Sequence, residues 1–211
     1  DELEGNLISQ NEQNGIFVTG IGNTIAGNTI TVNTHDGIYV TGGNLNLIGT
    51  NGNGVADALE GNLISGNLDY GIQIYQANET TAAGNKIGTN VSGEARFANM
   101  DGGIYIWDGY ANVIGTDGAG SGAIAEGNLI PGNNNNGIKR YISEGNTLAG
   151  NKIGTNWSGT AALYNGNAGI YFDRSYFNFI GTTGDGVGDA LEGNLISGNG
   201  GDGVVITGID S

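Results

Sequence analysis

The pentapeptide Glu-Gly-Asn-Leu-Ile occupies residues 60–64 and returns at 126–130 and 192–196, 66 residues apart each time. The tripeptide Ile-Gly-Thr precedes each of these three copies at the same distance, beginning at Ile48, Ile114 and Ile180, and a further copy of the pentapeptide stands at residues 4–8. Similarity at a fixed spacing is the sequence signature of a repeat architecture. We therefore expect structural copies that stack on one another.

Each 66-residue period contains two rounds of three short phrases, which read Gly-Ile-x-Ile, Asn-x-Ile/Leu and Asn-x-Ile in that order. Apolar residues at every second position in short bursts indicate strands, and the spacing of an amphipathic helix is not sustained anywhere. Matching phrases would stack about 4.8 Å apart in a parallel sheet. The pattern predicts an all-β, single-stranded parallel β-helix, a β-solenoid of about seven three-sided coils.

The coils differ in length because extra residues are inserted at two places. The shortest coil runs from Gly15 to Gly37, and later coils are lengthened either after the second phrase or after the third. The two kinds of insertion alternate along the chain. Loops at alternating corners leave the stacked core of a solenoid untouched.

The composition excludes several classes of protein. Of 211 residues, 6 are Lys or Arg and 21 are Asp or Glu, which gives a formal net charge of −15. No basic patch is expected, so nucleic acid and anionic membrane surfaces are poor partners. The chain has no Cys and therefore no disulfide or thiolate metal site, and no apolar run approaches the roughly 20 residues of a membrane span.

The phrases GNLISGN, GNKIGTN and NVIGTDGAGSG resemble the right-handed parallel β-helix repeats of the pectate-lyase-like superfamily, common in large exported bacterial proteins. The resemblance covers essentially the whole chain. It implies one right-handed β-helix domain over residues 1–211, in a secreted or cell-surface bacterial protein. The superfamily includes lyases, hydrolases, epimerases, adhesins and stalks, so the fold by itself does not imply an activity.

Both ends of the sequence fall inside repeats, at residues 1–6 and 203–211. End coils without a cap leave strand edges open. We therefore expect a fragment of a longer solenoid, capable of self-association through its open ends.

Aromatic residues recur at the outward positions of the Gly-Ile-x-Ile strands. Six are expected on one solvent-facing sheet: Tyr39, Tyr75, Tyr105, Trp107, Tyr141 and Tyr171. Exposed aromatic rings stack on sugar rings, so these residues, together with Lys139, are candidates for binding a polysaccharide or a cell-surface glycan. The alternative is that the rings only pair along the sheet, because aromatic residues have a high strand propensity.

One corner beside this sheet carries titratable residues on successive coils. His35, Asp69 and Asp101 each lie two positions before the glycine of the strand phrase. Carboxylates on adjacent coils can serve as a general acid/base pair, which makes the three residues candidate catalytic groups. They would equally suit Ca²⁺, or act only as turn residues.

Arg140 occupies a position filled elsewhere by Val, Ile or Phe that faces the core. A buried guanidinium without a partner is costly. A local bulge that turns Ile142 inward instead would avoid this cost. The alternative is a clamp for a substrate carboxylate, formed with Lys139 and Arg174.

The first kind of inserted loop carries acidic residues in matching places. The candidates for a metal site are Asp57, Glu60, Asp185, Asp189 and Glu192. Residues 184–189 resemble part of a thrombospondin-type calcium loop, which suggests Ca²⁺ as a cofactor. The middle copy has Ala119 and Ala123 at the matching positions, and no metal is required by the spacing.

Three functions follow from these observations. The first is an extracellular or cell-surface scaffold with a carbohydrate-binding aromatic face. The second is a polysaccharide-active enzyme, a lyase, hydrolase or epimerase, that uses the histidine and the two aspartates. The third is a structural stalk or adhesin segment without a ligand.

Overall fold

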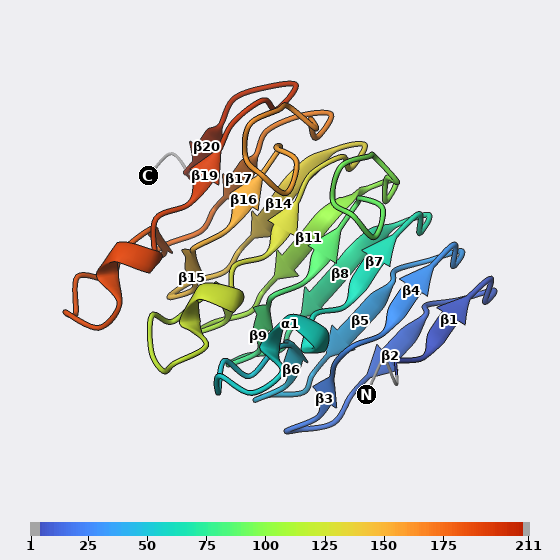
Figure 1. Cartoon of the computed structure of the whole chain (residues 1–211), viewed down its shortest axis with the longest axis horizontal. Helices are drawn as coiled ribbons and strands as arrows, with labels where there is room; N and C mark the ends of the chain where they lie inside the picture. The colour runs from blue at the N-terminus through green and yellow to red at the C-terminus, as the bar shows by residue number, and fades with distance from the viewer. Residues whose placement is uncertain (1–4, 209–211) are drawn as a thin grey trace.

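The computed structural model describes residues 5–208 and shows three parallel sheets wound around one core (Figure 1). Consecutive strands belong to different sheets, and each strand pairs with the strand one coil away. The predicted parallel β-helix is confirmed. Residues 1–4 and 209–211, on which the expectation of open ends partly rests, lie outside the described residues.

Sheet A contains seven strands, in the order β1 (Leu7–Ser9), β4 (Thr29–Thr31), β7 (Leu63–Ser65), β10 (Lys86–Ile87), β13 (Leu129–Ile130), β16 (Lys152–Ile153) and β19 (Leu195–Ile196). Sheet B also contains seven, in the order β2 (Ile16–Val18), β5 (Ile38–Thr41), β8 (Tyr70–Tyr75), β11 (Gly102–Trp107), β14 (Asn136–Tyr141), β17 (Ile170–Asp173) and β20 (Val204–Thr207). Sheet C contains six, namely β3 (Thr24–Ile25), β6 (Leu47–Gly49), β9 (Thr81–Ala83), β12 (Val113–Gly115), β15 (Thr147–Ala149) and β18 (Phe179–Ile180).

Inward side chains of the three sheets form one apolar column along the axis. On sheet B, Ile72 pairs in register with Ile38 and Ile104, and all three side chains have no exposed surface. The same holds on sheet A for Ile64 and Ile87. Burial of each such side chain stabilises the fold by roughly 1.5–3 kcal/mol.

Asparagine ladders line the corners of the coil, one of them at the Asn-x-Ile phrases. The first joins Asn6, Asn28, Asn62, Asn85, Asn128, Asn151 and Asn194, each Nδ2 donating to the Oδ1 one coil later. A second ladder, which the sequence patterns did not reveal, joins Asn11, Asn33, Asn67, Asn99, Asn133, Asn165 and Asn199. These amides satisfy buried backbone groups at each bend, so they fix where the chain turns.

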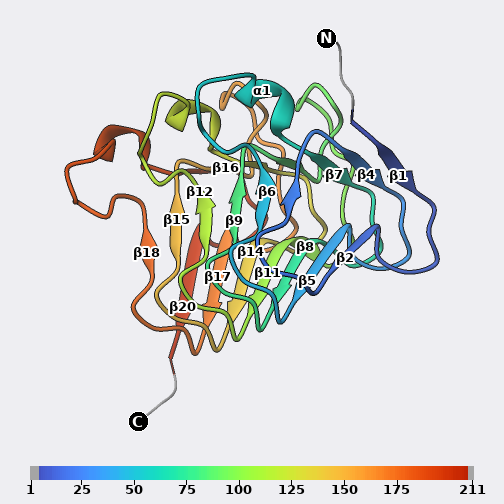
Figure 2. The same cartoon turned by 90° about the horizontal axis from the view of Figure 1, so that it is seen from below.

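The inserted loops lie at alternating corners, as expected. Those after sheet C carry α1 (Asp57–Glu60) and two 3-10 turns, Ala123–Ala125 and Asp189–Leu191, and they stand out from the sheets in Figure 2. Loops two coils apart touch, since the backbone N–H of Gly122 donates to the carbonyl of Gly52 at 3.1 Å. No helix among the described residues has the length and apolar character to cross a bilayer.

Gly49 illustrates why glycine begins these loops. Its φ is 106°, and a Cβ there would lie 1.8 Å from the carbonyl oxygen of Ala83. Only glycine allows this close approach of two coils. Gly115 repeats the same geometry one period later, with a φ of 105° and Ala149 as the neighbour.

Candidate functional site

The outer side of sheet B carries a continuous line of aromatic rings. Ring centroids are 5.6 Å apart for Phe17 and Tyr39, 6.4 Å for Tyr39 and Tyr75, 5.0 Å for Tyr75 and Trp107, and 5.9 Å for Trp107 and Tyr141. The side chains lie between solvent and the sheet, and Trp107 is 37% exposed. We call these five residues, with Tyr105 and Tyr171, the aromatic face.

Two cations lie over rings in the C-terminal half of this face. The Nζ of Lys139 is 5.1 Å from the ring centre of Tyr105, and the guanidinium of Arg174 is 5.4 Å from that of Tyr141. Arg174 also donates a hydrogen bond from Nη1 to the Tyr141 hydroxyl at 3.0 Å. Such contacts stabilise a cation over a ring by about 0.5–1 kcal/mol at exposed sites. They leave the rings of Tyr39 and Trp107 without a cation, in contact with Tyr75 between them.

Tyr171 and Lys139 lie side by side in neighbouring strands and line a shallow depression of about 420 Å³. Its other wall is formed by polar residues at the start of the strands, among them Asn135 and Asn167. The depression connects the aromatic face to the corner between sheets A and B. The candidate binding residues therefore share one surface.

The structure brings His35, Asp69 and Asp101 together at this corner. The backbone N–H of Asp69 donates to the carbonyl of His35, and that of Asp101 donates to the carbonyl of Asp69. His35 Nδ1 is 3.0 Å from Asp69 Oδ2, and both side chains are partly exposed. Burial, and to a smaller extent the charge of Asp69, raises the pKa of Asp101.

Asp36 belongs to the same corner and was missed by the sequence analysis. It is only 4% exposed, and its Oδ1 accepts a hydrogen bond from the backbone N–H of Tyr70 at 2.9 Å. Burial first, and then repulsion from Asp69, raises the pKa of Asp36 to about 7. The signal in the sequence was weak, because other coils have Asn14 and Asn136 at this position, and these asparagines accept the same hydrogen bond.

Tyr70 joins the corner to the aromatic face. Its ring centroid is 4.8 Å from that of Tyr105, and burial raises the pKa of its hydroxyl. The nearby carboxylates of Asp101 and Asp36 raise it further. The corner thus combines a proton-binding carboxyl group near neutral pH with an adjoining ring platform. We call His35, Asp36, Asp69, Tyr70 and Asp101 the acidic corner.

Arg140 is buried in the core, and the predicted bulge is absent from β14. The strand pairs in register on both sides, with Arg140 between Ile106 and Phe172. The side chain has no exposed surface, its guanidinium lies 4.6 Å from the Phe172 ring centre, and its nitrogens have no hydrogen-bond partner among the described residues. Ile142 is 44% exposed instead. The predicted bulge was wrong, because β14 pairs regularly with a strand on each side and has no extra residue. The predicted clamp was wrong as well, because the buried Arg140 side chain cannot contact a ligand.

The loop acids close their own loops. The Thr50 hydroxyl donates to Asp57 Oδ1 at 3.2 Å and to Glu60 Oε2 at 2.9 Å, and the backbone N–H of Gly54 donates to Asp57. In the middle loop, Thr116 donates to Glu126, and burial raises the pKa of Glu126. These hydrogen bonds hold the acidic side chains against their own loops.

The third copy of this loop gathers its acids more closely. One oxygen from each of Asp185, Asp189 and Glu192 lies within 4.8 Å of the others. The backbone N–H of Thr183 donates to Glu192 at 2.7 Å. Oxygen atoms at this separation match the ligand type that Ca²⁺ prefers.

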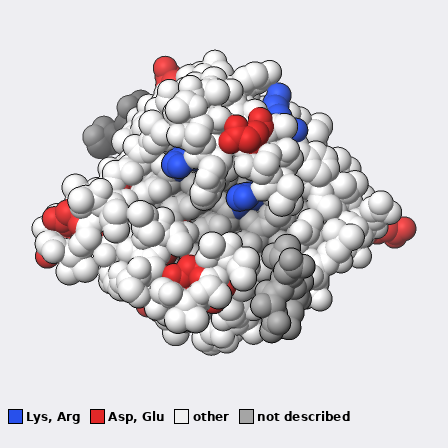
Figure 3. Space-filling model, in the orientation of Figure 1, with Lys and Arg blue, Asp and Glu red and all other residues white. Residues whose placement is uncertain are grey.

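Charged side chains are sparse over much of the surface. In the view of Figure 3, acidic groups lie at the margins and also near the middle, a few basic groups lie between them, and most of the face is uncharged. A surface of this kind suits an uncharged or cationic ligand better than an anionic one.

A family model described as a right handed beta helix region matches residues 2–177. The comparison with curated proteins and the comparison with solved structures gave no match.

Proposed function

The chain belongs to the right-handed β-helix family, and we propose that it is a secreted or cell-surface scaffold whose aromatic face binds a polysaccharide. The observation that carries this proposal is the unbroken line of ring contacts from Phe17 to Tyr141 on the outer side of sheet B. The repeats resemble those of exported bacterial proteins, which supports the location.

The arrangement of the rings suits an extended ligand. The rings lie on successive coils about 4.8 Å apart, so they form a row of platforms along the axis. The C–H faces of sugar rings stack on such platforms, and contiguous apolar patches on a surface mark binding sites. A rigid solenoid keeps the row in place without an ordering cost on binding.

The charges around the face favour a neutral or amino-bearing glycan. The acidic corner flanks one end of the strands, and the two cations of the face already lie over Tyr105 and Tyr141. With a net charge of −15, the molecule repels polyuronates at low ionic strength.

Gel retardation tests the proposal. The protein is run in native gels that contain a neutral glycan, chitosan or polygalacturonate, beside Trp107→Ala and Trp157→Ala. Trp157 is a matched control, because its side chain is 52% exposed but lies on a loop away from the aromatic face, with the Nζ atoms of Lys86 and Lys152 near its ring. We expect Trp107→Ala alone to lose retention. Equal retention of both variants would refute the role of the face, and no retention of the wild type by any glycan would leave a ligand-free stalk or adhesin segment.

Polysaccharide cleavage at the acidic corner is a second candidate function. It is favoured by Asp36, whose pKa of about 7 suits proton exchange at neutral pH, beside Asp69 and Asp101. Release of reducing ends or of unsaturated products from the retained glycan would support it. Loss of that release in Asp69→Asn would assign it to this corner.

We also propose Ca²⁺ as a ligand of the third loop, on the spacing of the oxygens of Asp185, Asp189 and Glu192. The cation would bind beside the hydrogen bonds that Glu192 and Asp189 already accept from the backbone N–H groups of Thr183 and Gly186.

A further inference from the structure

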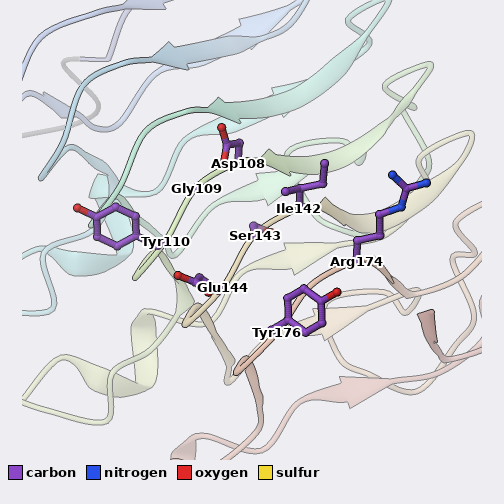
Figure 4. A pocket seen from close by; sticks show the side chains of 8 residues that line it. All are labelled: Asp108, Gly109, Tyr110, Ile142, Ser143, Glu144, Arg174 and Tyr176. Carbon is purple, nitrogen blue, oxygen red and sulfur yellow. The ribbon is translucent and has the colours of Figure 1, made fainter. Parts of the chain in front are cut away.

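We infer that a second pocket, at the corner between sheets B and C, binds a single sugar ring that carries a protonated amine. The pocket has a volume of about 260 Å³ and is lined by residues from three successive coils (Figure 4). None of these side chains belongs to the aromatic face. The choice of a sugar as the ligand rests on the proposed function, whereas the pocket itself is a separate site.

The pocket is formed by a repeated left-handed bend. Asp108, Ile142 and Arg174 follow the last residues of β11, β14 and β17, and their φ values are 51°, 47° and 49°. Left-handed backbone is unusual for any residue but Gly and Asn, and most unusual for a β-branched one such as Ile142. The bend turns the chain away from sheet B immediately beyond Trp107 and Tyr141, so the pocket adjoins the aromatic face.

Two tyrosines form the sides of the pocket. Tyr110 and Tyr176 are 49% and 45% exposed, and each pairs through a single bridge with Glu144 on the coil between them. Figure 4 shows Glu144 between the two tyrosines. The three side chains therefore form a row along the pocket, with the carboxylate between the two rings. The exposed side chain of Ile142 adds an apolar surface.

The polar groups of the pocket are incompletely paired. The Ser143 hydroxyl is buried and has no hydrogen-bond partner among the described residues. The exposed Glu144 carboxylate accepts no hydrogen bond from any described side chain or backbone group, whereas Asp108 Oδ2 accepts one from Gln76 at 3.0 Å. The exposed Glu144 carboxylate is therefore the acceptor that the pocket leaves open to a ligand.

The charge that remains open in the pocket is negative. Arg174 also lines the pocket, but its guanidinium donates a hydrogen bond to the Tyr141 hydroxyl and its Nε lies 3.9 Å from Asp173. Glu144 forms no ion pair with any of the described residues. An ammonium group on the sugar would supply the missing cation, while a uronate carboxylate would be repelled. Stacking on the tyrosines and pairing with Glu144 together select an amino sugar.

Calorimetric titration with short chito-oligosaccharides tests the inference, using the deacetylated and the N-acetylated forms as probes. We expect the deacetylated form to bind at least tenfold more tightly to the wild type, because a hydrogen bond to a charged group contributes about 1.5–3 kcal/mol. Glu144→Gln keeps the shape and removes the charge, so it should abolish this preference. Tyr176→Ala should weaken both forms by tenfold or more.

The controls separate the pocket from the face. Trp107→Ala should leave the preference for the deacetylated form unchanged, and all variants should melt like the wild type because the altered side chains are exposed. A preference that survives in Glu144→Gln, or binding unaffected by Tyr176→Ala, would overturn the pocket. If Trp107→Ala alone abolishes binding, the face stands without the pocket. If only Glu144→Gln and Tyr176→Ala abolish binding, the pocket is the binding site and the proposed role of the aromatic face is refuted.

Discussion

The inner and outer sides of sheet B are made by alternate residues of the same seven strands, yet they tolerate different residues. On the inner side, Ile38, Ile72, Ile104 and Ile138 repeat with no exposed surface. On the outer side, the column in register with Tyr39 contains Gln73, Tyr105 and Lys139. Packing fixes the inner residues, whereas the outer ones are limited only by strand propensity and by what they contact in solvent.

Lys139 and Arg140 show the difference within one strand. Both are cations over aromatic rings, Tyr105 outside and Phe172 inside. Lys139 keeps its contact with water, while Arg140 has lost it and gained no hydrogen bond from the described residues. A basic side chain therefore destabilises the fold little on the outer side of the sheet and much more on the inner side.

The largest effect is expected from a matched pair of alanine substitutions on β11. Ile104→Ala removes a side chain without exposed surface and should lower the free energy of unfolding by about 2–5 kcal/mol. Tyr105→Ala, one residue away on the outer side, should cost less than about 1 kcal/mol. Urea denaturation measures both. Equal losses would show that the outer side is also a packed core.

Arg140→Met should raise the free energy of unfolding by about 1–4 kcal/mol, because it replaces a buried charge by an apolar side chain of similar length. Lys139→Met should change it by no more than about 0.5 kcal/mol. Burial lowers the pKa of Arg140 to about 9. The unfolded state then binds more protons above pH 9, so the wild type gains stability as the pH rises and the advantage of Arg140→Met shrinks. A destabilised Arg140→Met would mean that the guanidinium has a partner.

Asp36 lies two residues before β5 of sheet B, and its contribution to the free energy of unfolding depends on pH. Because its pKa is raised to about 7 in the folded state, the folded state binds more protons than the unfolded state between about pH 4 and 7. Its contribution is fully present below the unfolded pKa and is lost as the pH rises through 7. Acidification from pH 8 to 5 should therefore stabilise the wild type by about 2 kcal/mol.

Asp36→Asn should flatten this dependence and retain the hydrogen bond to Tyr70, as Asn14 and Asn136 do on other coils. Thermal melting of both proteins across this range provides the measurement. A variant with the full pH dependence of the wild type would assign the proton to another group.

The smallest effect is expected in the loops, which lie outside sheet B. With Ca²⁺ in tenfold excess over its dissociation constant, binding to the third loop should stabilise the protein by about 1.4 kcal/mol. Chelation should reverse the shift, and Asp189→Asn should remove it. Asp117→Asn, in the middle loop with Ala119 and Ala123, is the matched control. An unchanged melting curve with and without chelator would contradict the calcium site.

The fold followed from the sequence because the inner side repeats strictly. The register of Ile72 with Ile38 and Ile104 could be read from spacing alone, and so could the first asparagine ladder. The second ladder was not found, because the loops at 88–102 and 154–168 change the distance from Asn85 to Asn99 and from Asn151 to Asn165. A long insertion changes the spacing of equivalent residues in the sequence, although those residues still stack in the structure.

The candidate site followed only in part. The positions of Trp107 and Asp69 could be assigned by column, but the burial of Asp36 depends on Tyr70 one coil later and leaves no local pattern. The pocket at Glu144 depends on left-handed bends, which usually require Gly or Asn and here occur at Asp108, Ile142 and Arg174. Arg140 was wrongly placed because the cost of burying it was taken to exceed the cost of breaking two regular strand pairings.

The most direct test of the aromatic face uses the two tryptophans as separate reporters. Trp157→Phe leaves Trp107 as the only tryptophan, and Trp107→Phe leaves only Trp157. Each variant is titrated with the glycan that slows the protein in the gel. The fluorescence emission of Trp107 should change, and the affinity obtained from it should equal the affinity from gel retardation. The emission of Trp157 should stay unchanged. Unchanged emission from Trp107 at saturating glycan would show that the ligand binds elsewhere.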